Sequence, residues 1–121
     1  MKRASNLIFL FLSVCLLLAC EEQLQEPDYN QAAIGQLDHS IDSVIYYAHK
    51  SLAQNKGDAV DYNSYYMLGY AYDVKNDYRK ALVNYLKANE TVPQAQEFAA
   101  DRADILKNLG RVCKIHHNYP Q

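Results

Sequence analysis

Cysteine and histidine are the side chains of this 121-residue sequence that could most readily bind a metal. Cys113 lies close to His116 and His117, and thiolate and imidazole groups are the usual ligands of zinc. A structural zinc site needs about four such ligands, and the sequence offers no Cys-x-x-Cys pair and no further ligands at a suitable spacing. We therefore expect no metal site, and interpret Cys113 as a small buried hydrophobic residue of a helix.

Patterns that would indicate catalysis or phosphate binding are also missing from the sequence. No serine, histidine and aspartate are spaced as a nucleophilic triad, no carboxylates are paired in an apolar setting, and no glycine-rich loop occurs. We therefore expect neither an enzyme nor a cofactor.

The first nineteen residues have the layout of an export signal. Lys2 and Arg3 are positively charged, residues 7–19 are almost entirely apolar, and this stretch ends directly before Cys20. An apolar span of about 13 residues is shorter than the roughly 20 that a membrane-crossing helix needs. The sequence predicts a cleaved signal peptide over 1–19 rather than a permanent transmembrane anchor.

Residues 17–20, Leu-Leu-Ala-Cys, resemble the lipobox of bacterial lipoproteins. The resemblance implies that a diacylglyceryl group is attached to the thiol of Cys20 and that the chain is cut just before it. Cys20 would then anchor the mature protein to an envelope membrane, because two or three acyl chains hold a protein durably. The alternative is ordinary signal cleavage beside an incidental cysteine, but that route prefers a small residue where Leu17 stands.

The mature sequence has a modest negative charge. Loss of Lys2 and Arg3 leaves 10 basic and 14 acidic side chains, a net charge of −4 with histidine neutral. This balance implies no basic face for nucleic acid. Cys15 leaves with the signal and Cys20 would be modified, so Cys113 has no cysteine to pair with and we expect no disulfide.

Two regions follow the predicted signal. Residues 20–36 are mostly polar and include Pro27, which predicts a flexible tether. From Leu37 almost to the end, apolar and aromatic residues recur at helical spacing, and no alternating strand pattern occurs. We therefore predict an all-α domain over 37–121.

One internal pattern resembles the tetratricopeptide repeat (TPR). The residues that match its signature at the family's spacings are Tyr65, Leu68, Gly69, Tyr72, Ala81, Tyr85, Ala88 and Pro93. The resemblance implies a pair of helices that approach closely at Gly69 and Ala81, with a turn at 73–77. Pro93 would end the second helix, because proline cannot donate the backbone hydrogen bond that continuation requires. The clearest repeat covers 62–95.

Weaker matches flank this repeat. Forty-one residues further on, the same frame is met by Leu106, Leu109, Gly110, Cys113 and Tyr119, which predicts a partial third repeat over 103–121. Upstream, 42–52 resembles a second repeat helix, in which Val44, Ala48 and Ser51 take the places of Ala81, Tyr85 and Ala88. Its first helix would have to lie within 31–37, so we expect a degenerate leading repeat or a single capping helix.

The predicted fold is thus a short solenoid of TPR-type helical hairpins, truncated at its C-terminal end. About three repeats are normally needed for a stable stack, because each repeat buries its apolar face only on its neighbours. Either the chain begins a longer protein, or a partner covers the side that Leu106, Leu109 and Cys113 would leave uncovered.

The TPR resemblance also implies a binding surface, since the first helices of successive repeats line a groove in that family. Tyr66 and Tyr70 on one such helix and Lys107 and Arg111 on the next are our candidate partner-binding residues, because their spacing places each pair on one helix face. An extended or helical segment with acidic residues would suit them, although Asp73 and Asp104 nearby would weaken their positive field. The alternative is that Lys107 and Arg111 form a solvated helix face.

These observations favour a membrane-anchored TPR lipoprotein that acts as a protein–protein interaction scaffold in the bacterial cell envelope, with other proteins or peptides as partners. The alternative is the N-terminal extracytoplasmic sensor region of a larger TPR signalling protein, with a kinase or DNA-binding output module beyond Gln121.

Overall fold

A computed structural model describes residues 6–8, 10 and 25–118 of the chain, and within these the fold is all-helical. The elements of the domain are α2 (Tyr29–Gly35), α3 (Ile41–Ala53), α4 (Asp58–Val74), α5 (Tyr78–Thr91), the short 3-10 helix η1 (Gln96–Phe98) and α6 (Ala99–Asn118). Most of the predicted signal peptide, together with Cys20 and Tyr119, lies outside the described residues. None of the helices that the structure describes has the length and apolar character required to cross a membrane.

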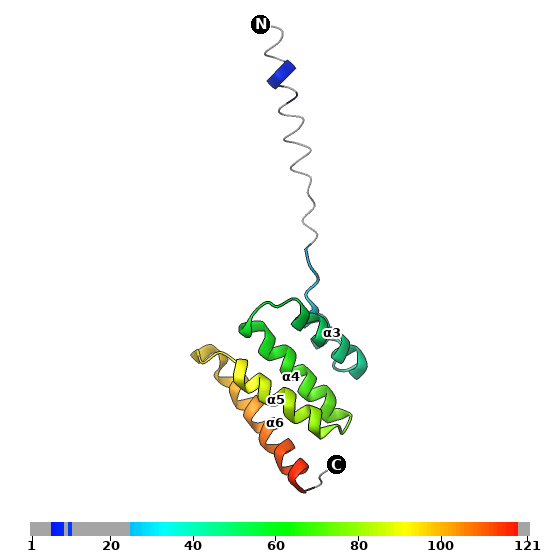
Figure 1. Cartoon of the computed structure of the whole chain (residues 1–121), viewed down its shortest axis with the longest axis vertical. Helices are drawn as coiled ribbons and strands as arrows, with labels where there is room; N and C mark the ends of the chain where they lie inside the picture. Colours follow the sequence, from blue (N-terminus) through cyan, green and yellow to red (C-terminus); the bar gives the residue numbers. More distant parts are fainter. Residues whose placement is uncertain (1–5, 9, 11–24, 119–121) are drawn as a thin grey trace.

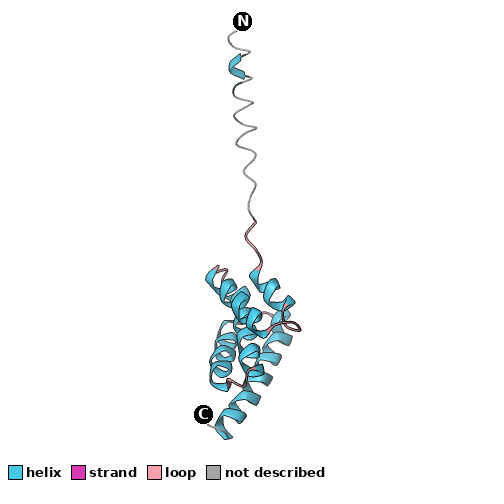
Figure 2. Cartoon of the chain, turned by 90° about the vertical axis from the view of Figure 1, so that its right-hand side faces the viewer, coloured by secondary structure: helices cyan, strands magenta, loops and turns pink. Residues whose placement is uncertain are grey.

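Helices α3 to α6 lie side by side in chain order, each packed on the next (Figure 1). Seen from the side, short loops connect them (Figure 2). The apolar interior consists of three clusters between successive helices. The first lies around Val44, Ala48 and Leu68, the second around Ala81, Tyr85 and Val112, and the third around Ala88, Val92 and Ile105.

Capping side chains and a proline determine where α3 and α5 begin and where α5 ends. The side chains of Ser40 and Asp77 accept hydrogen bonds from the backbone of Ser43 and Lys80, at 3.2 and 3.1 Å, and so cap α3 and α5. α5 ends at Thr91, and Val92 is extended because the residue before a proline is disfavoured in a helix.

Among the described helices, α4 and α5 pack on each other most extensively. A turn over 75–77 joins the two helices, and in it Asn76 adopts the left-handed conformation with φ of 59°. A β-carbon at Gly69 would lie 2.6 to 2.9 Å from ring carbons of Tyr85, which is completely buried. Only glycine at 69 therefore allows the Tyr85 ring to lie directly on α4, as expected from the sequence.

The buried residues of α3 agree with the equivalence to α5 that was predicted from the sequence. α3 buries Val44, Ala48 and Ser51, and α5 buries Ala81, Tyr85 and Ala88, which are the residues that the sequence comparison had placed in equivalent positions.

The prediction of a flexible tether over 20–36 is wrong for its last part, because residues 29–35 form α2 and pack on α3. The Asp28 carboxylate caps this helix by accepting hydrogen bonds from two backbone amides, both at 3.1 Å. Ala33 is completely buried in the first cluster, and the ring of Tyr29 stacks on that of Tyr47 with centroids 6.3 Å apart. The domain therefore begins with a short helix inside the predicted tether.

The last helix packs through one face and exposes another. Ile105 and Val112 of α6 are buried, whereas Leu106 is 55% exposed and Cys113 is also exposed. The interpretation of Cys113 as a buried hydrophobic residue is therefore wrong, since no described helix follows α6 to cover that face. The connection from α5 is held by Arg102, whose guanidinium donates to the carbonyl oxygens of Pro93 and Ala95, both at 2.8 Å.

Candidate binding site between α4 and α6

A hollow of about 220 Å³ separates α4 from α6. We call it the α4–α6 hollow, and it is lined by Tyr62, Asn63, Tyr66, Met67, Asp101, Asp104 and Ile105. The tyrosines and Met67 come from α4 and the two aspartates from the start of α6. Its surface therefore combines aromatic rings with two carboxylates.

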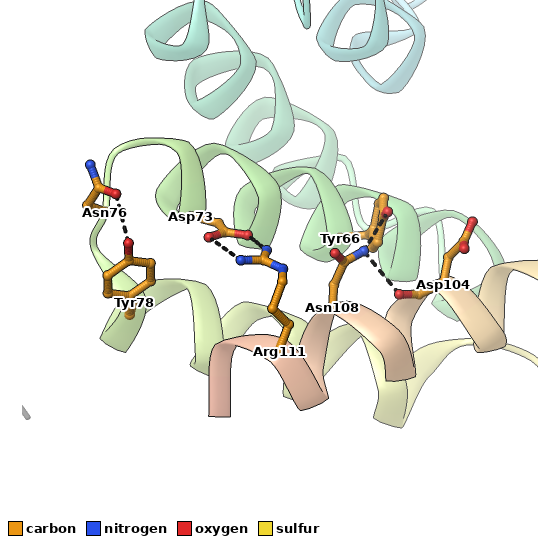
Figure 3. Close-up of polar contacts among 7 residues, drawn as sticks. All are labelled: Tyr66, Asp73, Asn76, Tyr78, Asp104, Asn108 and Arg111. Atoms are coloured by element: carbon orange, nitrogen blue, oxygen red, sulfur yellow. Dashed lines mark hydrogen bonds and ion pairs between the residues drawn. The ribbon is translucent and has the colours of Figure 1, made fainter. Parts of the chain in front are cut away.

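Side chains bridge the two helices at three levels. Tyr62 donates from its hydroxyl to the Asp101 carboxylate at 3.2 Å, and Asn108 donates from its amide nitrogen to the Tyr66 hydroxyl at 3.1 Å. Further along, the guanidinium of Arg111 faces the carboxylate of Asp73 and forms a two-pronged ion pair with it (Figure 3). These bridges place α4 and α6 on one surface, as the sequence had suggested.

Two of the four predicted partner-binding residues are occupied within the domain. The ring of Tyr66 packs among all three apolar clusters, with its centroid 5.7 Å from that of Tyr85. Arg111 is engaged by Asp73, whose side chain is only 11% exposed. Tyr66 therefore lines the hollow while its ring is held in the core, and the charge of Arg111 is balanced.

The other two predicted residues are exposed. Tyr70 is 38% exposed on α4, and Lys107 is exposed on α6. Neither lines the α4–α6 hollow. Each follows a residue that lines the hollow by one helical turn, Tyr70 after Tyr66 and Lys107 after Asp104. A ligand larger than the hollow would therefore contact them.

The tyrosine hydroxyls beside the hollow titrate in a negative environment. Burial raises the pKa of Tyr62, and the neighbouring Asp101 carboxylate raises it further. Burial also raises the pKa of Tyr66, with a further contribution from Asp104, while the hydrogen bond from Asn108 acts in the opposite direction. Both hydroxyls consequently stay protonated and neutral at physiological pH.

The candidate metal ligands do not lie close together as a metal site requires. Cys113 and His117 are exposed and His116 is half-buried near the end of α6. Among residues 25–118 and the few described before them, no three cysteine, histidine or acidic side chains come close enough together to hold a metal ion.

The acidic side of the site was missing from the predicted set. Asp101, Asp104 and Asn108 follow a spacing of three and four residues, which places them on one face of α6 toward α4. This signal is visible in the sequence, but the nearby Lys107 and Arg111 had suggested a basic surface. Tyr62 lies four residues before Tyr66 and extends the aromatic face of α4 by one turn.

Comparison of the chain with protein-family models, with curated protein sequences and with solved structures gives no match.

Proposed function

We propose that the chain is a lipid-anchored helical-repeat protein of the TPR type that binds other proteins or peptides in the bacterial cell envelope and performs no reaction of its own. The observation that carries this proposal is the surface between α4 and α6, where two helices are bridged by side chains around an aromatic and polar hollow. Aromatic residues with polar handles are enriched where proteins bind other proteins.

The repeat character of the proposal rests on positions that recur. Ser64 and Ala71 are buried on α4, and Ile105 and Val112, forty-one residues later, are buried on α6. On α3 and α5, the buried residues recur thirty-seven residues apart. Helices of alternating type that bury equivalent positions are what a stack of helical hairpins requires.

The groove can be tested with exposed residues, so that folding is not disturbed. Replacing Tyr66 would remove core packing and replacing Arg111 would leave Asp73 unpaired, whereas Tyr70 and Lys107 are exposed. Peptides selected from a displayed library on the wild-type chain are expected to bind a Tyr70→Ala variant at least fivefold more weakly, as measured by calorimetry.

A matched control is Tyr46→Ala on α3, where the exposed tyrosine lies beneath the Lys50 ammonium, 5.6 Å from its ring centroid. This variant should bind the selected peptides as the wild type does. If the Tyr70→Ala variant binds with unchanged affinity, or if no peptide is enriched, the proposed groove is wrong.

The lipid anchor rests on the lipobox-like residues 17–20 and predicts a covalent modification. In a bacterial host that processes lipoproteins, the wild-type chain should incorporate radioactive palmitate and lose residues 1–19. Cys20→Ala should abolish labelling and leave the uncleaved precursor, since the thiol that carries the diacylglyceryl group is gone. Cys113→Ala is the control and should be labelled as the wild type is. Recovery of a soluble mature Cys20→Ala protein with the wild-type cleavage point would contradict the anchor.

A second candidate function is the extracytoplasmic sensor region of a longer signalling protein, and the outer face of α6 favours it. Leu106 is 55% exposed there, Cys113 is exposed, and a β-carbon at Gly110 would meet no atom within 4 Å. A further helix could pack on this face as α5 packs on α4. The reading frame of the gene after codon 121 decides between the two candidates.

A further inference from the structure

The lining of the α4–α6 hollow is acidic, contrary to the basic groove that Lys107 and Arg111 suggested. Asp101 and Asp104 both contribute to it, and no basic side chain is among the described residues that line it. The two arginines of α6 are engaged elsewhere, Arg102 by the carbonyl oxygens of Pro93 and Ala95 and Arg111 by Asp73. The two carboxylates therefore give the hollow a negative potential.

The aromatic walls of the hollow are held in place before any ligand arrives. The Tyr62 ring packs edge-on against Phe98, with centroids 5.7 Å apart and planes at 87°, and its hydroxyl donates to Asp101. Tyr66 is fixed between the Tyr85 ring and the Asn108 amide. Because these side chains are already ordered, a ligand would lose little binding energy in fixing them.

This combination selects one ligand chemistry. Tyrosine rings attract a cation placed on them, and carboxylates form charge-assisted hydrogen bonds with ammonium and guanidinium groups. An anionic group would meet both aspartates and the tyrosine hydroxyls without a balancing charge. Met67 and Ile105 supply apolar surface for an aliphatic stem.

The size of the hollow limits the ligand to about one side chain. Its volume of about 220 Å³ corresponds to roughly seven water molecules. Drug-sized ligands occupy sites of about 300–1,000 Å³, which is larger than this hollow. A larger partner would have to place one group in the hollow and the remainder on the exposed surface beside Tyr70 and Lys107.

We propose that the α4–α6 hollow binds the cationic group and aliphatic stem of one arginine or lysine side chain, presented by a peptide segment of a partner protein. The proposal deepens the peptide-binding function proposed above and rests on it. Asp101 and Asp104 would accept hydrogen bonds from the cation, and Tyr62 and Tyr66 would contact it through their rings.

The test is a titration of the isotopically labelled full chain, purified in non-ionic detergent, followed by two-dimensional amide NMR. The probe is a capped heptapeptide with one arginine between three glycines on each side, and the comparison peptides carry glutamate or alanine in its place. The arginine peptide should shift the amide signals of Tyr62, Tyr66, Asp101 and Asp104. The shifts should weaken when salt is raised from about 0.1 M to 0.5 M, because salt screens charge.

Substitutions that remove a negative charge and conserve side-chain shape test which residues bind the cation. Asp101→Asn with Asp104→Asn should weaken binding of the arginine peptide at least tenfold. Asp38→Asn with Glu90→Gln removes the same amount of charge from exposed positions on other parts of the domain and should leave the affinity within twofold. Equal affinities for the two double variants would overturn the proposal.

The remaining outcomes show whether the cation belongs to a peptide or to a small molecule. They also show whether the cation site or the broader peptide-binding function is wrong. Free propylguanidinium should cause the same shifts with lower affinity. If it binds as tightly as the peptide, the ligand is a small organic cation and the peptide assignment is wrong. Shifts caused by the glutamate peptide and not by the arginine peptide would overturn the cation site while leaving a peptide-binding groove in place. If no probe shifts these signals, the cation site is wrong, and the library selection described above decides the broader function separately.

Discussion

Gly69→Ala is expected to lower the Tm of the domain by roughly 10 °C, which corresponds to about 2 kcal/mol for a domain of this size. The added β-carbon would come within 2.6 to 2.9 Å of ring carbons of Tyr85. The ring is completely buried and packs against Tyr66, so it cannot move aside without opening α4 from α5. Overpacking of this kind costs about 1–3 kcal/mol, more than the gain of up to about 1 kcal/mol from replacing a helical glycine. Thermal melts followed by circular dichroism measure the change.

Gly110→Ala is the matched control, because Gly110 has the place on α6 that Gly69 has on α4. A β-carbon at Gly110 would meet no atom within 4 Å. This variant should therefore raise the free energy of unfolding by about 0.5–1 kcal/mol through helix propensity alone. Gly69→Ala melting at or above the wild-type temperature would contradict the packing of Tyr85 on Gly69. A destabilised Gly110→Ala would show instead that something covers the outer face of α6.

The α4–α5 hairpin could be predicted from the sequence because the residues that determine it are recognisable from their type and spacing. Gly69 and Ala81 permit a close approach, Tyr85 fills the space between them, and Pro93 fixes where the second helix ends. Each of these residues acts through size or backbone chemistry that the sequence displays directly. The structure places the helices of this hairpin at 58–74 and 78–91, close to the expected repeat.

α2 could not be predicted in this way, because its stability comes from distant residues. The helix has seven residues and ends at Gly35, and a helix that short is marginal in isolation. Burial of Ala33 and stacking of Tyr29 on Tyr47 supply the missing stability. The Asp28 cap was visible in the sequence but not decisive beside a polar and proline-containing stretch.

The charge of the candidate site was mispredicted for a related reason. The helical spacing correctly placed Arg111 on the side of α6 that faces α4. The sequence indicated that Asp73 and Asp104 would weaken the positive field nearby, but it could not show that Asp73 pairs directly with Arg111. With Arg111 paired, Asp101 and Asp104 set the potential of the hollow.

The packing of α6 bears on the expectation that Leu106, Leu109 and Cys113 would be left uncovered. Leu106 and Cys113 are exposed as expected, whereas Leu109 is half-buried and packs against the second cluster. Tyr65 and Tyr72 on α4 face α5, and the ammonium groups of Lys87 and Lys80 lie 5.4 and 5.1 Å from their ring centroids. Leu106 is the residue aligned with Tyr65, and it faces outward because α6 has no such partner among the described helices. The residues that α6 buries, Ile105 and Val112, lie on the opposite face, which packs against α5.

Ile105→Asp is accordingly expected to cost about 3–5 kcal/mol, since it places an unpaired charge in the third cluster. That loss is a large part of the 5–15 kcal/mol by which domains are usually stable. We expect urea unfolding of this variant to begin at far lower concentrations than for the wild type, or α6 to separate from α5.

Leu106→Asp is the matched control one residue away, with the same new side chain on the same helix. Because Leu106 is 55% exposed, this change should cost less than about 1 kcal/mol, most of it from the lower helix propensity of aspartate. Comparing the urea midpoints of the two variants shows which face of α6 is buried. If Leu106→Asp is the more damaging of the two, α6 packs through the face that carries Leu106, and the orientation of α6 described above is wrong.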